Sequence, residues 1–563
     1  MEKITKENKK GKKLIITFII MFIIIAIFVG FYIVNNVIVF DQNASTNLVI
    51  NNKNITSNLK KQVLIQDDVI YLSKQDIANF FDKYIYEDSK VQKIITTNED
   101  KVASIGFNSD TINVNGSDKR IKAHAINKND TIYIPISEMT DIYNIEIKNI
   151  SSSKVVTIDS KDRELKRATL TSNSTVKSST NFIAKTVDKV KKGENVYLIS
   201  SENNGWSKIR TENGKLGFVK TAKLTNETTL RVKAEEKSKQ INGKVNLVWD
   251  YYSEVATAPD RTNTRIEGVN VVSPAFFHLD SKGVIQANIG ESGQKYIEWA
   301  HKNGYKIWPM VQNAGDGMLK VTSGIMNDYN KRQNLIEQIV RMCKTYKIDG
   351  INIDFENMKK EDKDLYSRFI IELTPRMQEL GLVTTVDVTA PDGGDTWSLC
   401  FDRHVIGDVA DYIIFMAYDE FGSSSSEAGP TAGYDWVKLS LNKFLKTEEI
   451  ESNKIILGVP FFTRLWTIDS KGYVKSSVVT MKNINRALPN SNIEKKWDDG
   501  AKQNYVEYLE GSNTKKMWIE DIESLKTKLN LINENNLAGV GAWAKGMENE
   551  DIWKVFKEEL SIK

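Results

Sequence analysis

Cysteine and histidine are both scarce in this chain of 563 residues. The only two cysteines, Cys343 and Cys400, are too few for a disulfide scaffold or a cysteine-based metal site, so we expect two buried thiols. The four histidines lie far apart, without the spacing of metal ligands: His124, His278, His301 and His404. The sequence therefore predicts no metal, no cofactor and structural roles for the histidines.

An excess of charge of one sign is also missing. The formal net charge is only +4, and lysine and arginine are spread along the chain rather than gathered in basic stretches interleaved with aromatic residues. Nucleic acid is therefore excluded as an expected partner, whereas an anionic surface such as a bacterial cell wall would be tolerated. The shares of 40% hydrophobic and 27% charged residues are those of globular proteins, and the length requires about two to four domains.

One long apolar run, residues 14–34, stands near the start of the chain. It carries no charge and, at about 20 residues, is long enough to cross a bilayer as a helix. Six lysines precede it, so the positive-inside rule places residues 1–13 in the cytoplasm and the rest of the chain outside. We expect a transmembrane helix and a single-pass protein of the cell membrane; a cleaved signal peptide is the alternative.

Residues 45–160 predict a small α+β module, because short β-branched runs alternate there with turn residues. One phrase appears twice, as Asp68-Val-Ile-Tyr-Leu-Ser73 and as Asp130-Thr-Ile-Tyr-Ile-Pro135, each before a short helical pattern. The first copy leads into Ser73-Lys-Gln-Asp76, which resembles a capping box. The region resembles the N-terminal module of copper amine oxidases. It has no His/Cys cluster, so the resemblance implies a stalk or a wall contact and no copper.

Residues 166–225 predict a second small module, built from short strands interrupted by glycine. The phrases Gly205-Trp206 and Gly217-Phe218-Val219 resemble those of bacterial SH3 modules, which are small β-barrels. The resemblance implies binding of peptidoglycan peptides, and a rigid spacer is the alternative that the sequence leaves open. A lysine-rich linker, residues 226–244, leads to the largest domain.

Residues 243–563 predict a (β/α)8 TIM barrel, because eight apolar runs with strand character alternate with helical patterns. The expected strands are residues 245–249, 269–272, 306–310, 350–355, 383–388, 412–417, 454–459 and 539–542. The domain also contains all of the 11 tryptophans except Trp206. Tryptophan suits the flat face of a sugar as well as a protein core.

The fourth of these strands differs from a usual barrel strand, since it reads Asp349-Gly-Ile-Asn-Ile-Asp-Phe-Glu356. Side chains alternate along a strand, so Asn352, Asp354 and Glu356 share one face. Barrel strands are normally apolar on both faces, and inward acids cost free energy unless they have a function. The carboxyl end of a barrel strand is also where such enzymes place their catalytic residues. We therefore predict the active site of an enzyme here.

This stretch resembles the signature D-x-x-D-x-D-x-E of glycoside hydrolase family 18. Asp349, Asp354 and Glu356 match the signature, whereas Asn352 stands where the family usually has its middle Asp. The resemblance implies a retaining glycosidase in which the 2-acetamido group of the substrate is the nucleophile. The substrate must then carry an N-acetyl group at C2.

Two further motifs carry the resemblance, since Met416-Ala-Tyr-Asp419 ends the sixth strand and Trp543 ends the eighth. The resemblance implies three catalytic residues. Glu356 is the proton donor and later the base, Asp354 holds the acetamide N–H, and Tyr418 donates its hydroxyl to the acetamide oxygen. It also implies four substrate-binding residues: Asn352, Met416, Asp419 and Trp543, the last as the floor under the sugar ring. For Asp419, a cap of its own loop is the alternative.

The chain resembles the branch of family 18 that includes spore-cortex and cell-wall-lytic enzymes. Three phrases carry this resemblance: Ser273-Pro-Ala-Phe-Phe277, Trp308-Pro-Met-Val-Gln312 and Trp518-Ile-Glu-Asp-Ile-Glu-Ser524. It implies an N-acetylglucosaminidase that acts on peptidoglycan, with chitin or an N-glycan core as alternative substrates. A sugar-binding protein without activity and a structural tether between membrane and wall are alternative functions, which the presence of both Asp354 and Glu356 disfavours.

Overall fold

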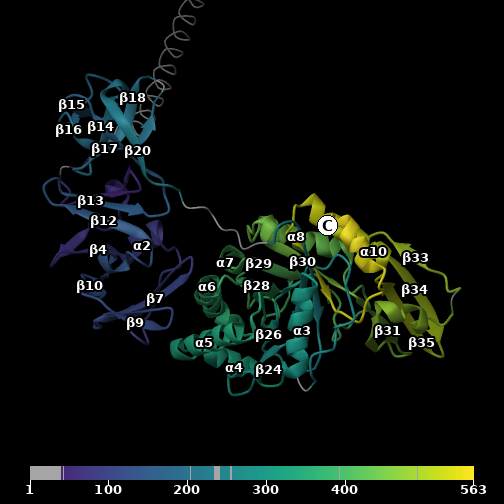
Figure 1. Ribbon diagram of the computed structural model, residues 1–563. Coiled ribbons are helices and arrows are strands. Elements are labelled where there is room, and N and C mark those ends of the chain that lie inside the picture. Colours follow the sequence, from purple (N-terminus) through teal and green to yellow (C-terminus); the bar gives the residue numbers. More distant parts are fainter. Residues whose placement is uncertain are drawn as a thin grey trace, which may run out of the picture.

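The computed structural model describes residues 40–562, except residues 42, 203, 234–240, 254–255, 392 and 491. The predicted cytoplasmic tail, residues 1–13, and the predicted transmembrane helix, residues 14–34, lie outside the described residues. Within the described part of the chain, no helix is long and apolar enough to span a membrane. This part forms a β-rich N-terminal region and a C-terminal barrel (Figure 1).

Three small sheets and helix α2 (Lys74–Phe80) form the first part of the N-terminal region. The first sheet has the strand order β12 (Ile145–Ile150), β13 (Val155–Ser160), β1 (Asn47–Ile50) and β2 (Lys53–Asn54). The second has the order β10 (Ile126–Lys128), β11 (Thr131–Pro135), β4 (Val69–Ser73) and β3 (Leu64–Gln66). The third has the order β5 (Tyr86–Asp88), β6 (Lys93–Asn98), β7 (Lys101–Gly106), β8 (Thr111–Val114) and β9 (Ser117–Arg120). The two copies of the repeated phrase form β4 and β11, which pair antiparallel. The Ser73 hydroxyl accepts a hydrogen bond from Asp76 N and caps α2, as predicted.

Seven strands form the second part of the N-terminal region, in one antiparallel sheet. Their order is β16 (Thr186–Val190), β15 (Ser174–Lys177), β19 (Leu216–Lys220), β18 (Trp206–Thr211), β17 (Asn195–Ser201), β14 (Leu165–Leu170) and β20 (Leu224–Arg231). Arg210 joins this sheet to the first part, because its guanidinium binds both carboxylate oxygens of Asp159, at 2.8 and 2.6 Å. Leu216 packs at the same place against Val49 and Val155.

The C-terminal region is the predicted barrel of parallel strands. The strands are β21 (Val245–Asp250), β22 (Val271–Pro274), β25 (Lys306–Ile307) with β26 (Met310–Gln312), β27 (Gly350–Asp354), β28 (Val383–Val388), β29 (Tyr412–Met416), β30 (Ile455–Pro460) and β36 (Gly539–Trp543). The third strand is divided, so that β25 pairs with β22 and β26 pairs with β27, and β36 pairs with both β30 and β21 to close the barrel. All eight predicted strands are confirmed.

Helices surround these strands and bury their outer face, which explains why the strands are apolar on both sides. They are α3 (Gly290–Lys302), α4 (Met318–Met326), α5 (Tyr329–Tyr346), α6 (Lys363–Glu379), α7 (Arg403–Val409), α8 (Tyr434–Lys446), α10 (Ile522–Glu534) and α11 (Ile552–Glu559). The one-turn helix α9 (Ile484–Ala487) lies instead in the segment inserted between β30 and α10. A short hairpin, β23 (Phe277–Leu279) and β24 (Ile285–Ala287), extends the sheet beside β26. Cys343 and Cys400 are both buried free thiols, as predicted.

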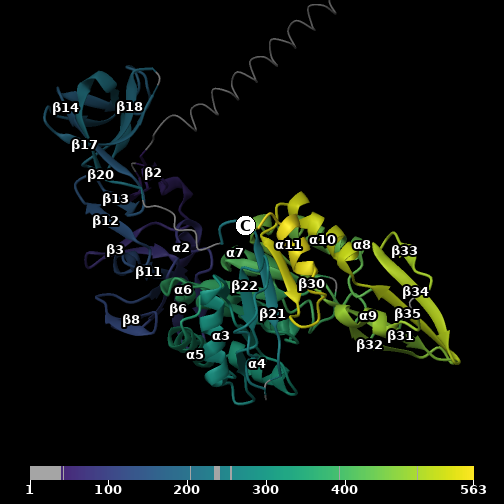
Figure 2. The same cartoon turned by 45° about the vertical axis from the view of Figure 1, so that its right-hand side comes forward.

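A five-stranded antiparallel sheet that was not predicted from the sequence is inserted between β30 and α10. Its order is β32 (Val474–Thr480), β31 (Phe462–Ile468), β35 (Asn513–Ile519), β34 (Gln503–Glu510) and β33 (Lys496–Asp498). Figures 1 and 2 show this sheet on the side of the barrel away from the N-terminal region. Because β31 begins just after β30 ends, the inserted sheet stands at the carboxyl end of the barrel strands.

The first part of the N-terminal region packs against the outside of the barrel, at α5 and α6 (Figure 2). Tyr329 of α5 donates a hydrogen bond to Ser104 Oγ at 3.0 Å. Arg368 of α6 donates from Nη2 to the Tyr84 carbonyl oxygen at 2.5 Å. The contact therefore involves the helical wall of the barrel and not the ends of its strands.

Candidate active site

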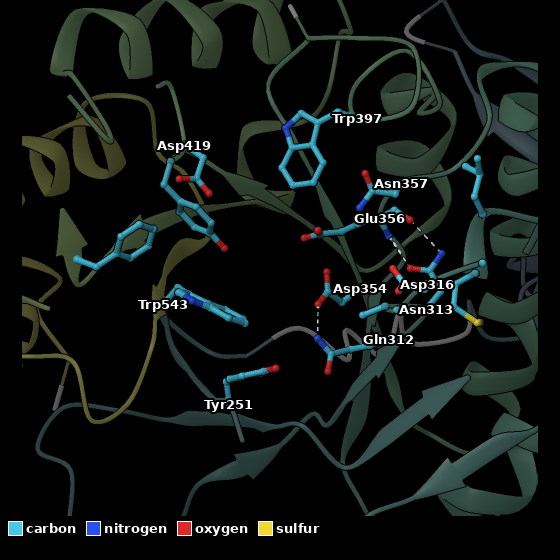
Figure 3. Close-up of a pocket in the computed structure, with 17 residues that line it drawn as sticks. Tyr251, Gln312, Asn313, Asp316, Asp354, Glu356, Asn357, Trp397, Asp419 and Trp543 are labelled. Atoms are coloured by element: carbon cyan, nitrogen blue, oxygen red, sulfur yellow. Dashed lines mark hydrogen bonds between the residues drawn. The ribbon is translucent and has the colours of Figure 1, made fainter. Parts of the chain in front are cut away.

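A cavity of about 490 Å³ opens at the carboxyl ends of the barrel strands (Figure 3). Its walls come from the barrel and from the start of the inserted sheet. Five of the seven predicted site residues line it: Asp354, Glu356, Tyr418, Asp419 and Trp543. Strand β27 and the ends of β29 and β36 bring these side chains together, as expected for a parallel barrel.

Asp354 is the last residue of β27 and is held from the neighbouring strand. Its Oδ2 atom accepts a hydrogen bond of 2.9 Å from Gln312 Nε2, at the end of β26. Its Oδ1 atom is buried and receives no hydrogen bond from an amide or hydroxyl group of the described chain. A carboxylate oxygen in this state can accept a hydrogen bond from the N–H group of a ligand.

Glu356 lies two residues after Asp354 on the same face of the strand, and its surroundings favour the protonated carboxyl. Burial raises its pKa most, and the negative charge of Asp354, a hydrogen bond with Asp354 and the charge of Asp419 bring the pKa well above its ordinary value. Burial also raises the pKa of Asp354, but hydrogen bonds from Gln312 and Glu356 oppose this rise. Since the shared hydrogen bond raises the pKa of Glu356 and lowers that of Asp354, the proton belongs to Glu356. The pair therefore places an acid beside an anion.

The backbone of Glu356 is fixed by Asn313, which directly follows β26. Asn313 Oδ1 accepts a hydrogen bond of 2.8 Å from Glu356 N, and Asn313 Nδ2 donates one of 3.0 Å to Glu356 O. Asn313 Nδ2 also donates to Thr322 Oγ1 in α4 at 3.1 Å. These bonds hold the carboxyl-bearing residue in one orientation. No role for Asn313 was predicted from the sequence.

Aromatic rings form two sides of the cavity. The ring centroid of Trp543 lies 5.5 Å from that of Tyr251 and 5.9 Å from that of Trp249. Tyr251 is 48% exposed, and Trp397, in the loop after β28, is 36% exposed. Figure 3 shows Trp397 across the cavity from Trp543, with the Glu356 carboxyl between them. Two apolar faces around a few polar groups suit a ring-shaped ligand.

Tyr418 and Asp419 follow β29. Burial and then the charges of the nearby carboxylates, that of Asp387 first, raise the pKa of Tyr418 well above its ordinary value, so its hydroxyl remains a donor. Asp419 has a positive φ of 59° and accepts a hydrogen bond of 2.9 Å from Arg464 Nη2 in the inserted sheet. Asp419 therefore lines the cavity and also joins the barrel to this sheet.

Asn352 and Met416 do not line the cavity, which corrects the prediction that they contact substrate. Asn352 is 0% exposed and Met416 is 5% exposed. Successive inward residues of a strand are about 6.6 Å apart along it. Asn352 therefore lies one layer below Asp354, and Met416 lies one layer below Tyr418.

A buried chain of hydrogen bonds runs below the two acids. Trp249 Nε1 donates to Asn352 Oδ1 at 2.8 Å, and Asn352 Nδ2 donates to Asp387 Oδ1 at 2.7 Å. Asp387 lies on β28 and is 1% exposed. Burial and the charge of Asp354 raise its pKa well above the ordinary value. Asp387 was not predicted, although an acid inside an apolar barrel strand was the signal that identified Asp354 and Glu356.

Asp349, the first residue of the family signature, lies at the opposite end of β27. Its carboxylate accepts hydrogen bonds from Lys306 Nζ at 2.8 Å, His301 Nε2 at 2.9 Å and Ile307 N at 3.1 Å. These contacts connect β27 to β25 and α3. Asp349 and His301 are therefore structural, as expected for the histidine.

Comparisons with known proteins agree with this geometry. The model of the family described as Glycosyl hydrolases family 18 matches residues 247–548. The model of the copper amine oxidase N-terminal domain matches residues 49–180, which confirms the resemblance of the N-terminal region.

Among curated proteins, the chain is similar to the uncharacterized glycosylase YvbX of Bacillus subtilis (strain 168), with 28% identity over 298 residues, 52% of this chain and 84% of that protein. It is 25% identical over 250 residues to the cortical fragment-lytic enzyme of the same organism, covering 42% of this chain and 56% of that protein. It is also 25% identical over 316 residues to human di-N-acetylchitobiase, covering 49% of this chain and 78% of that protein.

Among solved structures, a chitinase from Chromobacterium violaceum ATCC 12472 superposes with a TM-score of 0.50 at 22% identity, covering 57% of this chain and all of that one. This likeness concerns the fold alone. The match of the family model extends over more than half of the chain and includes the strand that carries Asp354 and Glu356. The chain belongs to glycosyl hydrolases family 18.

Proposed function

We propose that this protein is a membrane-anchored extracellular glycosidase that hydrolyses N-acetylglucosamine-containing peptidoglycan by retaining, substrate-assisted catalysis. One observation carries the proposal: the carboxyls of Glu356 and Asp354, neighbours on one strand face, line a cavity whose walls include Trp543 and Trp397. A proton donor between two aromatic faces is what cleavage of a glycosidic bond requires.

The arrangement of carboxyls favours a nucleophile that belongs to the substrate. In a two-carboxylate retaining enzyme, the acid and the nucleophile lie about 5 to 5.5 Å apart on opposite sides of the scissile bond. Asp354 instead lies on the same strand face as Glu356, where Gln312 binds its Oδ2 atom, and Asp419 is bound to Arg464. Neither therefore stands across the scissile bond from Glu356 as a second carboxylate would, whereas a 2-acetamido oxygen can reach the anomeric carbon from within the same sugar.

Each side chain has a defined role in this mechanism. Glu356 gives its proton to the leaving oxygen while the acetamide oxygen attacks C1 and the glycosidic bond breaks. Asp354 accepts the acetamide N–H and, as an anion, stabilises the positive oxazolinium ion; Tyr418 donates its hydroxyl to the acetamide oxygen. Glu356, now ionised, takes a proton from water. The water oxygen attacks C1 and opens the oxazolinium ring, so that the anomeric configuration is retained overall. Trp543 supports the sugar ring throughout.

Peptidoglycan is the favoured substrate because of what surrounds the barrel and what its relatives act on. The similar Bacillus subtilis protein is named for lysis of cortical fragments. We further propose that residues 166–225 are an SH3-like module that contacts the wall. Phe182 is 70% exposed and Ile183 is 90% exposed. The ring of Phe182 lies 5.3 Å from that of Trp206, which gives this module an apolar contact surface.

A chito-oligosaccharide is the alternative substrate, since human di-N-acetylchitobiase is also similar to the chain. Purified peptidoglycan and chitin oligomers should be digested in parallel, and the fragments identified by mass spectrometry. The sugar held in the cavity becomes the reducing end of the product. We expect N-acetylglucosamine at the new reducing ends of peptidoglycan fragments. N-acetylmuramic acid at these ends, or cleavage of chitin alone, would contradict the proposal.

The membrane anchor is proposed from residues 14–34, and the stalk from residues 45–160. In intact cells, an external protease should release the barrel by cutting after Phe40. Protection of the barrel from the protease would contradict the outward orientation.

A further inference from the structure

Asp387 is a buried carboxyl beside the proposed active site, and the mechanism above gives it no role. Strand β28, which carries it, pairs in parallel with β27. Asp387 is 1% exposed and its Oδ1 atom accepts the 2.7 Å hydrogen bond from Asn352 Nδ2. Burial of a carboxyl inside an apolar barrel costs free energy, so its presence requires an explanation.

The contact with Asp387 depends on the amide of Asn352, whose orientation is fixed from the other side. The indole N–H of Trp249 can only donate, and it points at Asn352 Oδ1 from 2.8 Å. The Ser273 hydroxyl donates to the same oxygen at 3.3 Å. The amide nitrogen of Asn352 must therefore face Asp387, as it does. An Asp at position 352 would present an acceptor in this place, against another carboxyl.

The titratable groups that interact with Asp387 come from three surrounding elements. They are Asp354 and Glu356 at the end of β27, Tyr366 of α6 and Tyr418 after β29. None of the four is a cation. Among the described residues, the Asp387 carboxyl is thus balanced by hydrogen bonds and not by a cation. A negative charge on Asp387 raises the pKa of the two proposed catalytic acids.

We propose that Asp387 supplies, from the neighbouring strand, the third carboxyl that family 18 usually places at position 352, and that it acts as a positioning residue for the proton of Glu356. Asp387 does not touch the substrate. The site then contains three acids, as in the usual family signature, but Asp354 and Glu356 come from β27 and Asp387 comes from β28. This inference rests on the proposed function, because it concerns the proton that Glu356 transfers.

The three acids must release their protons one at a time, because each negative charge opposes the next ionisation. At low pH Asp387 is neutral and differs little from an Asn. As the pH rises and Asp387 ionises, its charge holds the remaining proton on Glu356. Glu356 consequently stays competent as an acid to a higher pH than it would beside an uncharged residue.

The test is the pH–rate profile of Asp387→Asn with an aryl glycoside of an N-acetylglucosamine disaccharide, measured on the full chain. The alkaline limb should move to lower pH by about one unit, since one unit corresponds to a modest interaction between buried charges. The acidic limb should stay in place. The double variant Asn352→Asp/Asp387→Asn should bring the alkaline limb back toward the parent, because it returns a carboxyl to the same pair of positions.

Two results would overturn the inference: a profile of Asp387→Asn that superimposes on the parent, or a double variant no closer to the parent than the single one. A barrel with parental tryptophan fluorescence in both variants shows that folding is not the cause. Failure of the proposed function is seen separately, as persistent turnover in Glu356→Gln.

Discussion

Replacing Asp387 with Asn should make the stability of the barrel less sensitive to pH. Burial and the charge of Asp354 raise the pKa of Asp387 well above its ordinary value. The folded barrel thus keeps a proton that the unfolded chain releases above a pKa of about 3.9. For a carboxyl with a raised folded pKa, stability is highest at low pH and is lost as the pH rises toward the folded pKa. Each pH unit in that window costs the parent about 1.4 kcal/mol of unfolding free energy, a loss that Asp387→Asn avoids.

Denaturant unfolding between pH 4 and 8, followed by tryptophan fluorescence, measures this effect on the barrel, because all of the 11 tryptophans except Trp206 lie there. The unfolding free energy of Asp387→Asn should increase relative to that of the parent as the pH rises from about 4.

Asp349→Asn is the matched control, because its effect on stability should change with pH in the opposite direction. Burial alone would raise the pKa of Asp349, but hydrogen bonds from Lys306, Ile307 and His301 lower it overall. The folded pKa of Asp349 is therefore below the unfolded one, and its stabilisation is present above the unfolded pKa and lost as the pH falls. Asp349→Asn should be less stable than the parent at neutral pH, with a difference that shrinks in acid. A pH-independent difference for Asp387→Asn would refute the reasoning.

Three further predictions concern the cavity and the N-terminal region. Asn352→Asp adds a carboxyl against Asp387 and should raise the pKa of Asp354, moving the acidic limb of the pH–rate profile to higher pH; a superimposable limb would show that Asn352 only forms structural hydrogen bonds. Trp543→Ala should lower kcat/KM about tenfold, equivalent to about 1.4 kcal/mol of lost sugar contact, and Trp543→Phe should lower it less; equal kinetics for both would remove Trp543 from the sugar site. Deletion of residues 166–225 should weaken pull-down with cell walls while hydrolysis of a small soluble substrate stays near the parental rate; unchanged wall binding would make this part a spacer.

The barrel could be predicted from the sequence because both faces of its parallel strands are buried. Such strands read as short apolar runs, and all eight were visible. The inserted sheet was missed for the opposite reason. Strand β32, for example, has only one buried residue among exposed and partly buried ones, and β34 has two buried residues out of eight. Short polar ribbons of this kind resemble loops in the sequence.

The acids of the cavity were predictable to the extent that strand alternation determines the face of a side chain. Glu356 and Asp354 were identified in this way, and Asp387 carried the same signal without being recognised. Strand alternation does not determine how deep in the barrel an inward side chain lies. Asn352 was therefore predicted to line the cavity, although it lies one layer below the cavity. Tyr251 and Trp397 could not be predicted, because both lie in loops whose course depends on tertiary contacts.

The turnover of Glu356→Gln is the decisive measurement for the assignment of the catalytic acid. The substitution preserves the size of the side chain but removes the proton that the mechanism transfers. We expect turnover to fall about a hundredfold or more, with binding of a peptidoglycan fragment retained. Glu361→Gln, at an exposed residue five positions away, is the matched control and should turn over at the parental rate. Parental turnover in Glu356→Gln would contradict the assignment of Glu356 as the acid.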